Sequence, residues 1–160
     1  MSSTSSTPAR PSPRRHFLRG LLGFALAGLP RVPVVFAAAG RPKAAFAAEE
    51  LASALEALYG TTTFPTSDKI RIGVAKLAEN GAVVPVKVDV DLPHVEEIAL
   101  FASRNPVPLV ARFSFGPRTR PFVATRIKLK ETSEVIAVVR SRDGLSMARA
   151  AVEVTVGGCG

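Results

Sequence analysis

The sequence predicts an all-β domain, an antiparallel β-sandwich of about seven short strands, with one short helix before it and a flexible arm after it. Three observations support this prediction. Apolar residues alternate with polar ones at period two through much of 70–156, as in strands with one buried face. Turn-forming pairs rich in Gly, Pro, Asn and Asp separate these runs at roughly ten-residue spacing. The 160 residues suffice for one hydrophobic core.

The helix is predicted over residues 49–59. Leu51, Leu55 and Leu58 recur at helical spacing and give this segment one apolar face. Two glutamates open the segment, and the helix dipole favours acidic residues in the first turn. Gly60 follows directly and is typical of a helix end.

The strands follow in order along the rest of the domain. Isoleucine and valine alternate with polar or small residues over 70–74, and four valines alternate in the same way over 84–90. Glu-Asn-Gly at 79–81 predicts a turn between these two strands. Pro85 suits an edge strand or a bulge, because proline cannot donate a ladder hydrogen bond. The remaining expected strands are 95–102, 108–115, 122–130, 134–140 and 145–156.

This strand order indicates a sandwich that is immunoglobulin-like in outline. Asp143-Gly144 supplies the turn of the final hairpin. The paired cysteines and the tryptophan of true immunoglobulin domains are absent, because the chain has one cysteine and no tryptophan. We therefore expect a leader over 1–47, the sandwich with its helix over 48–156, and an arm over 157–160.

The leader is expected to be a cleaved export signal. A basic segment at 14–20 precedes a short apolar stretch at 21–29, and a small-residue cleavage motif follows at 45–47 or, as a second candidate, at 37–39. The apolar stretch is too short to span a membrane, so no membrane anchor is expected. A basic amphipathic surface helix is the alternative interpretation of this segment.

The basic segment resembles the twin-arginine export motif, which directs folded proteins to the bacterial periplasm. The matching residues are Arg14, Arg15, Phe17 and Leu18. Pro13 stands where the motif usually has Ser or Thr.

The net charge of +8 belongs almost entirely to this leader. Residues 1–43 hold seven of the 21 basic residues and none of the 13 acids, whereas residues 44–160 carry a net charge of +1. The aromatic residues are mostly phenylalanines in predicted strands, and they are not interleaved with the basic residues. Nucleic-acid binding is therefore not expected.

The single cysteine is the strongest candidate for a functional residue. Cys159 lies between Gly158 and Gly160, and Gly157 separates them from the last predicted strand. Glycine gives the backbone maximal freedom, so we expect an exposed thiol on a tether that reaches about 10 Å from Val156, at about 3.3–3.6 Å per residue. No histidine or cation stands beside the thiol to activate it. We therefore expect a covalent carrier thiol and no catalyst; a cysteine that merely cross-links two chains is the alternative.

Other polar residues give weaker signals. His94 is expected to be an exposed loop histidine, and Asp89 and Asp91 share a strand face without a third group that would make a catalytic pair.

One cysteine and two histidines exclude a disulfide within the chain, a cysteine-rich zinc site and an iron–sulfur cluster. No phosphate-binding loop or Ser-His-Asp set is present, so no cofactor is expected. Solvated surface positions, with anion or acidic-partner contact as the alternative, are expected for Arg118, Arg120, Arg126, Lys128 and Lys130.

Several stretches of the sequence carry a family resemblance. The Gly-Gly-Cys-Gly ending at 157–160 is the specific one; the interior matches concern core and turn residues and are ENGAVVPVKVDV at 79–90, RNPVPLVARFSF at 104–115 and ATRIKLKETSEVIAVV at 124–139. Over most of 48–160 the chain resembles the SoxY family of the bacterial Sox thiosulfate-oxidation system. The family usually ends in Gly-Gly-Cys-Gly-Gly, one glycine longer, and this difference leaves the tether before the thiol unchanged.

The resemblance implies a non-catalytic sulfur carrier in the periplasm. The haem cytochrome SoxAX would couple thiosulfate oxidatively to Cys159, the hydrolase SoxB would release sulfate, and in some organisms the sulfane dehydrogenase SoxCD would oxidise the remaining sulfur. The resemblance also implies a heterodimer with SoxZ, a second small β-sandwich protein that would leave the cytoplasm together with this chain. A carrier of the same architecture that serves another pathway is a further alternative.

Overall fold

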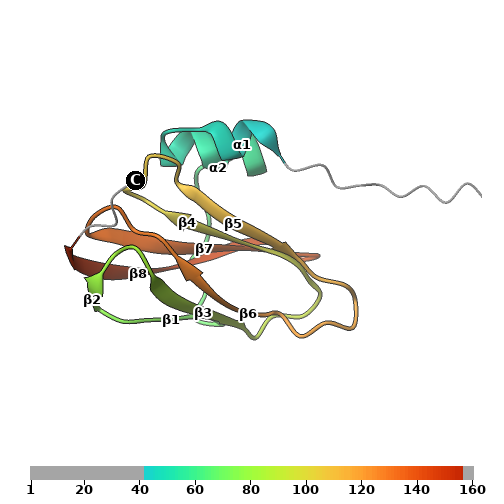
Figure 1. Cartoon of the computed structure of the whole chain (residues 1–160). Helices are drawn as coiled ribbons and strands as arrows, with labels where there is room; N and C mark the ends of the chain where they lie inside the picture. Colours follow the sequence, from blue (N-terminus) through green and yellow to red (C-terminus); the bar gives the residue numbers. More distant parts are fainter. Residues whose placement is uncertain (1–41, 157–160) are drawn as a thin grey trace, which may run out of the picture. The chain divides into compact units, whose positions relative to one another are not determined.

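The computed structural model describes residues 42–156, which form two β-sheets packed face to face with two helices on the outside of one sheet (Figure 1). The helices are α1 (Lys43–Ala47) and α2 (Leu51–Tyr59). The strands are β1 (Ile70–Val74), β2 (Leu77–Asn80), β3 (Val84–Val90), β4 (Val95–Ala102), β5 (Leu109–Ser114), β6 (Phe122–Ile127), β7 (Ser133–Ser141) and β8 (Gly144–Val156). The predicted all-β sandwich is confirmed.

One sheet has three strands in the order β1-β3-β6, and the other has five in the order β2-β8-β7-β4-β5. Neighbouring strands run antiparallel except β2 and β8, which are parallel. All seven expected strands are present, and β2 is an addition. Its four residues are mostly exposed and show no alternation. The turn predicted at 79–81 begins later than expected, because residues 79 and 80 belong to β2 and the turn follows at 81–82.

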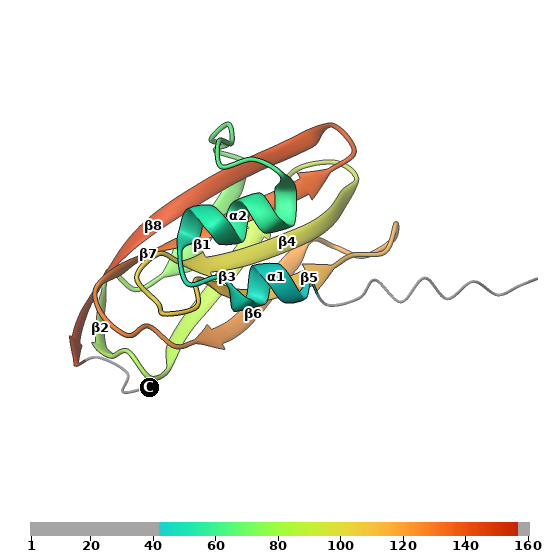
Figure 2. The same ribbon diagram turned by 90° about the horizontal axis from the view of Figure 1, so that it is seen from above.

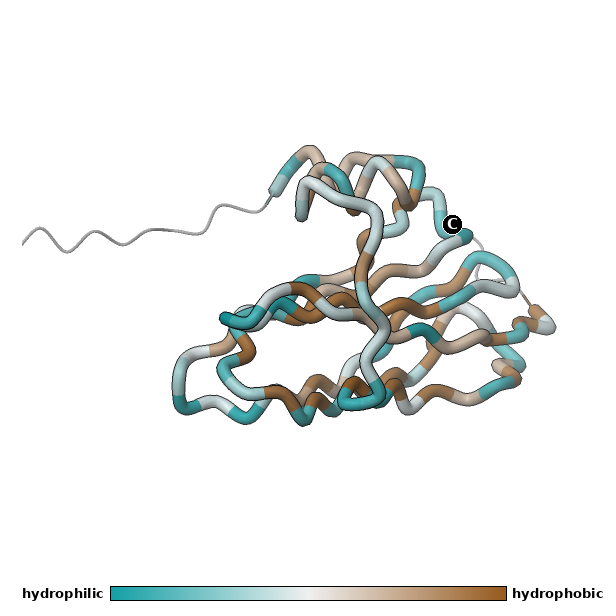
Figure 3. The backbone as a smooth tube through the Cα atoms, turned by 180° about the vertical axis from the view of Figure 1, so that it is seen from behind, coloured by the Kyte–Doolittle hydropathy of each residue, from teal (hydrophilic) through white to brown (hydrophobic). Residues whose placement is uncertain are grey.

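The core between the two sheets is built from the inward-facing residues of both. Val84, Val86, Val88 and Val90 are buried and alternate with more exposed residues along β3, as the period-two pattern predicts. Figure 3 shows such apolar positions recurring along the strands of both layers. The five-stranded sheet contributes, among others, Val95, Ile98, Leu100, Val135, Ala137 and Val139.

A second core lies between the five-stranded sheet and the helices, which cover its outer face (Figure 2). The helices contribute Ala45, Ala54 and Leu55, and the sheet contributes Ala99, Phe101, Leu109, Ile136, Val138 and Met147. β4 and β7 are therefore buried on both faces. This explains why their sequences are nearly continuous apolar runs, since strands buried on both faces do not alternate.

The helical part differs from the prediction of one helix. α2 begins at Leu51 with Glu50 at the N-cap position, so its first turn contains no acidic residue. Gly60 ends the helix as predicted, in the left-handed conformation with φ of 69°. α1 was not expected, because its residues overlap the small-residue motif at 45–47. It packs beside α2, and its Ala45 is fully buried. Within residues 42–156, no helix is long and apolar enough to cross a membrane.

β6 is shorter than the predicted strand over 122–130. It ends at Ile127, and the next residues leave the sheet. There the side-chain amide of Asn105 donates to the carbonyl of Lys128 at 2.7 Å, and its Oδ1 accepts from the backbone N–H of Lys130 at 3.0 Å. A side chain from another loop thus satisfies the backbone groups that a neighbouring strand would otherwise pair.

The prediction that Pro85 lies on an edge strand is wrong for β3 as a whole, but Pro85 does lie where β3 is paired on one side only. β3 is the central strand of its sheet, so Pro85 does not lie on an edge strand. However, the last register pair between β1 and β3 is Val74 with Val86, and Pro85 lies one residue beyond it. At Pro85 the strand has β6 as its one neighbour, and the missing N–H costs no hydrogen bond to β1.

A buried carboxylate connects α2 to the sheet. Glu97 of β4 is 3% exposed and lies on the helix-facing side. It accepts hydrogen bonds from the Tyr59 hydroxyl at 3.1 Å and from the Arg112 guanidinium of β5. Arg140 of β7 lies over the Tyr59 ring, 5.1 Å from its centroid, and donates to the Leu58 carbonyl at 3.5 Å. These contacts hold the C-terminal end of α2 against three strands.

The environment of this cluster changes the protonation of its members. Burial raises the pKa of Tyr59 far above its ordinary value, and the neighbouring Glu97 carboxylate raises it further. The hydrogen bond to Glu97 raises the pKa of Arg112. The folded state therefore keeps the phenol protonated and the guanidinium charged.

Tyr59→Phe is expected to lower the free energy of unfolding by about 1–3 kcal/mol at neutral pH, because Glu97 loses a donor. Above about pH 10 the unfolded phenol ionises while the folded one stays protonated, so the wild-type protein loses about 1.4 kcal/mol per pH unit and Tyr59→Phe does not. Urea titrations between pH 7 and 11 measure the difference. Tyr59 is the single tyrosine, so phenolate absorbance reports it alone, and ionisation of the folded protein near pH 10 would contradict this assignment.

The packing of α1 predicts that it belongs to the folded domain. A chain that begins at Ala48 is expected to be less stable by about 1–3 kcal/mol than one that begins at Pro42, because it leaves apolar surface of the second core uncovered. Within the longer chain, Ala45→Asp should destabilise the domain and Ala44→Asp, at an exposed position, should not. Equal stability of these two variants, measured by chemical unfolding, would show that α1 does not pack there in solution.

Candidate functional site

The predicted carrier arm, with Gly157, Gly158, Cys159 and Gly160, lies outside the described residues, and so do Arg14, Arg15, Phe17 and Leu18 of the leader motif. The structure does describe the residue from which the arm continues. That residue is Val156, the last residue of β8. The candidate site is therefore the part of the domain around this attachment point.

β8 is hydrogen-bonded to a neighbouring strand along its whole length, first to β7 and then to β2. It pairs with β7 from Gly144 to Val152, and its last residues pair with β2 as far as Val156. The carbonyl of Val156 accepts from the backbone N–H of Gly81 at 2.8 Å, and the Thr155 hydroxyl donates to the carbonyl of Glu79 at 3.0 Å. The root of the arm is thus a hydrogen-bonded strand and not a loop.

Three loops surround this root, and we call them together with Val156 the arm end: residues 81–83, 103–108 and 128–132. Gly81 joins two of them to the root, because its N–H donates to Val156 and its carbonyl accepts from the N–H of Leu129 at 2.7 Å. Asn105 ties the third loop to 128–130 through its two bonds to Lys128 and Lys130. Hydrogen bonds therefore connect all parts of the arm end.

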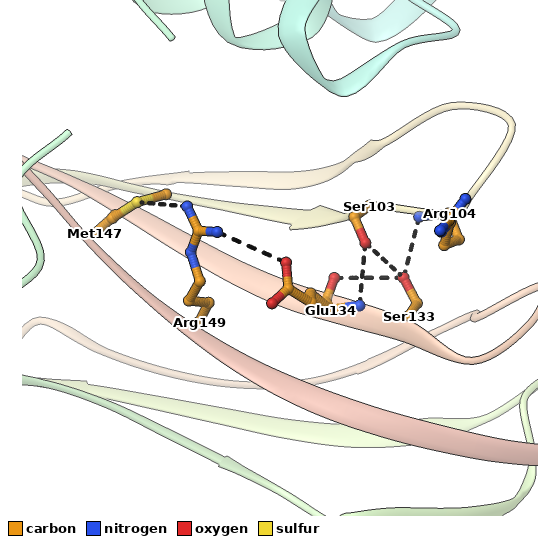
Figure 4. Close-up of polar contacts among 6 residues, drawn as sticks. All are labelled: Ser103, Arg104, Ser133, Glu134, Met147 and Arg149. Atoms are coloured by element: carbon orange, nitrogen blue, oxygen red, sulfur yellow. Dashed lines mark hydrogen bonds and ion pairs between the residues drawn. The ribbon is translucent and has the colours of Figure 1, made fainter. Parts of the chain in front are cut away.

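A pair of serines fixes the loop over 103–108 to the start of β7 (Figure 4). The hydroxyls of Ser103 and Ser133 lie 3.3 Å apart, and Ser133 is buried. The backbone N–H groups of Arg104 and Glu134 donate to these hydroxyls, each at 3.1 Å. The Glu134 carboxylate lies 3.8 Å from Arg149. The serine hydroxyls are thus occupied with backbone groups, which is a structural role.

His94 lies at the opposite end of the sandwich. Its backbone is in the left-handed region, with φ of 52°. It lines a cavity of about 360 Å³ together with Glu96, Thr119 and Arg142, and Arg142 lies 3.8 Å from the Glu96 carboxylate. β8 has 13 residues and begins at this end, so the cavity is roughly 40 Å from Val156 at about 3.3 Å per residue. A thiol on an arm of about 10 Å does not reach it.

Asp89 and Asp91 do not form a carboxylate pair. Asp89 lies 3.3 Å from Arg71 and 3.3 Å from Arg120, and these guanidinium groups lower the pKa of its carboxyl. Asp91 is exposed beyond the end of β3. Among the described residues, no group of three His, Cys, Asp or Glu side chains is placed to hold a metal ion.

The candidate cations separate into two groups. Arg118 and Arg120 lie in the loop between β5 and β6, at the end that carries His94, and Arg120 also lies over the Phe122 ring at 5.7 Å. Arg126 is near the end of β6, and Lys128 and Lys130 belong to the arm end. All five are exposed.

Three residues that organise the structure around the arm end and the helices were not predicted from the sequence, namely Asn105, Ser133 and Glu97. A signal for Glu97 exists in the sequence, since it interrupts the apolar run over 95–102. Asn105 and Ser133 show no such signal, because polar residues in turns are common and their distant partners are not visible in the pattern.

The comparisons with known proteins agree with this description. The model of the family described as "Sulfur oxidation protein SoxY" matches residues 55–159. A solved structure of the sulfur carrier protein SoxY from Chlorobium limicola f thiosulfatophilum aligns with a TM-score of 0.61 and 34% identity, over 67% of this chain and 97% of that one. No curated protein matches the chain.

Two structures of superoxide reductase (neelaredoxin) from Ignicoccus hospitalis are more distant. One aligns with a TM-score of 0.48 and 22% identity, over 54% of this chain and 79% of that one. The other aligns with a TM-score of 0.46 and 21% identity, over 54% of this chain and 80% of that one. The family match and the related carrier structure agree, and this chain belongs to the SoxY family.

Proposed function

We propose that this chain is a periplasmic sulfur carrier that holds thiosulfate-derived sulfur covalently on Cys159 and presents it to partner enzymes. The observation that supports this most directly is the extent of the family match, which runs through residue 159 and so includes the thiol. The related solved structure is itself described as a sulfur carrier protein. Membership of the family and the position of the only cysteine thus point to the same function.

The proposed chemistry begins with an oxidative coupling. The thiol and thiosulfate form a Cys–S–S–SO₃⁻ adduct, and one proton and two electrons are released. The electrons pass to the haem cytochrome, SoxAX. Water then cleaves the bond between the outer sulfane sulfur and the sulfonate in the hydrolase, SoxB, which yields sulfate, a proton and a persulfide on Cys159. Where SoxCD is present, it would oxidise the persulfide sulfur before a final hydrolytic release.

The sequence around the thiol supports a division of labour between this chain and its partners. Thiol reactivity requires a nearby base or cation, and the sequence places none beside Cys159. Activation would therefore occur inside each partner enzyme, where the arm enters. A substrate tethered on about 10 Å of chain stays at high effective concentration while several enzymes act in turn.

The leader and the partner subunit complete the proposal. The twin-arginine motif supports export of the folded chain, together with a SoxZ-like β-sandwich subunit, into the periplasm. The packing of α1 supports cleavage at the 37–39 motif over the 45–47 motif, because cleavage after Ala47 would remove α1 from the second core.

Cys159→Ser is expected to abolish sulfur adducts. The carrier is incubated with thiosulfate and the haem cytochrome, and intact-mass spectrometry detects the added mass on the wild-type chain only. A matched control places a thiol elsewhere: Arg118→Cys in the Cys159→Ser background should gain no adduct, because that loop lies at the other end of the domain. Adducts on Cys159→Ser would overturn the proposal, and a periplasmic pool consisting entirely of disulfide-linked homodimers would favour the cross-linking alternative.

The mature protein from the periplasm is expected to begin near Gly40, so that α1 is retained. The mass of the carrier purified from thiosulfate-grown cells gives its first residue directly. A mass that corresponds to a start at Ala48 would show that export removes α1 and that the second core is completed in another way.

A further inference from the structure

The exposed apolar residues of the domain are concentrated around the arm. Among the described residues, the exposed large hydrophobic side chains are Leu77, Val83, Val107, Phe122 and Val156. Val83, Val107 and Val156 belong to the arm end, and Leu77 begins β2, which runs toward it. Only Phe122 lies at the opposite end. Isolated exposed apolar residues are ordinary, but their gathering at one end is typical of an interaction site.

The arm end is also basic. Its charged residues are Arg104, Lys128 and Lys130, with Glu131 as the one acid, and all four are exposed. The buried side chain of Leu129 points into the core, so its neighbours Lys128 and Lys130 lie on the solvent side of the same segment. Arg126 near the end of β6 adds a further exposed cation. The exposed acids on the adjoining strands are Glu79 of β2, Glu134 of β7, which is paired with Arg149, and Glu153 of β8.

Hydrogen bonds fix the backbone of the residues that carry these side chains. Leu129 lies between Lys128 and Lys130, and its N–H donates to the carbonyl of Gly81. The N–H of Gly81 in turn donates to the carbonyl of Val156. The backbone of Arg104 is bonded to Ser133, and Asn105 next to it bonds to both flanks of Leu129. The backbone that carries these cations is therefore fixed relative to the root of the arm, which reduces the ordering cost of an interface built on it.

We infer that the arm end is the docking surface for the enzymes that receive the arm, and that it fits a partner whose channel opening is rimmed with carboxylates around an apolar patch. The valines would form the apolar centre of the contact, and the lysines and Arg104 its charged rim. Charges at a rim act mainly on the association rate and make it depend on salt. This inference rests on the proposed function, and it adds the chemistry of the partner surface.

The test uses the mature carrier with its partner subunit, in the Cys159→Ser background, so that binding does not require adduct formation. The affinity for the haem cytochrome is measured at about 0.05 M and about 0.5 M salt. Arg104→Gln/Lys130→Gln is expected to weaken binding about tenfold at low salt and less than about twofold at high salt, where charges are screened. Val107→Ser should weaken binding by a similar factor at both salt concentrations, because apolar contact is not screened.

The matched control is Lys69→Gln/Arg118→Gln. It removes the same charge from exposed positions at the opposite end of the sandwich and should leave the affinity unchanged. Equal effects of the two double variants, or no effect of either, would overturn the inference, and so would binding that does not depend on salt. Failure of the proposed function would give a different result: the wild-type carrier would bind the haem cytochrome normally but would gain no sulfur adduct.

Discussion

The burial of β4 and β7 on both faces is the constraint on which the rest of this structure depends. The three-stranded sheet covers one face and the helices cover the other, so a polar side chain that is buried in these strands must have partners. Glu97 meets this requirement through Tyr59 and Arg112, and the same contacts hold α2 in place. With β4 and β7 in the centre, β8 lies beside them, and its last residues extend beyond the pairing with β7 to the arm end.

The domain joins a fixed support to a tether whose sequence is mostly glycine. The support is fixed because each loop at the arm end is bonded to another loop or to a strand, through Gly81, Asn105 and the pair Ser103 and Ser133. The arm itself has a single reactive side chain. In the proposed function, reactivity and recognition would therefore be carried by different parts of the chain, so that a partner recognises the support while it acts on the thiol.

Much of the fold could be predicted from the sequence, because period-two alternation reports burial on one face directly. All seven expected strands and the helix end at Gly60 are present. The sequence could not give β2, whose short and exposed segment has no pattern, nor the end of β6, which depends on Asn105 from a distant loop. The thiol was evident from its position between glycines. The arm end was not, because it forms only when loops 81–83, 103–108 and 128–132 meet in three dimensions.

The way in which β8 is anchored has a mechanical consequence. In the proposed function, withdrawal of the arm from a partner enzyme would apply tension at Val156 along the axis of β8. The hydrogen bonds to β7 and β2 run across that axis, so such a load shears many of them together and does not peel them one at a time. The strand should therefore resist extraction, and repeated withdrawal of the arm from tight channels should leave the domain folded.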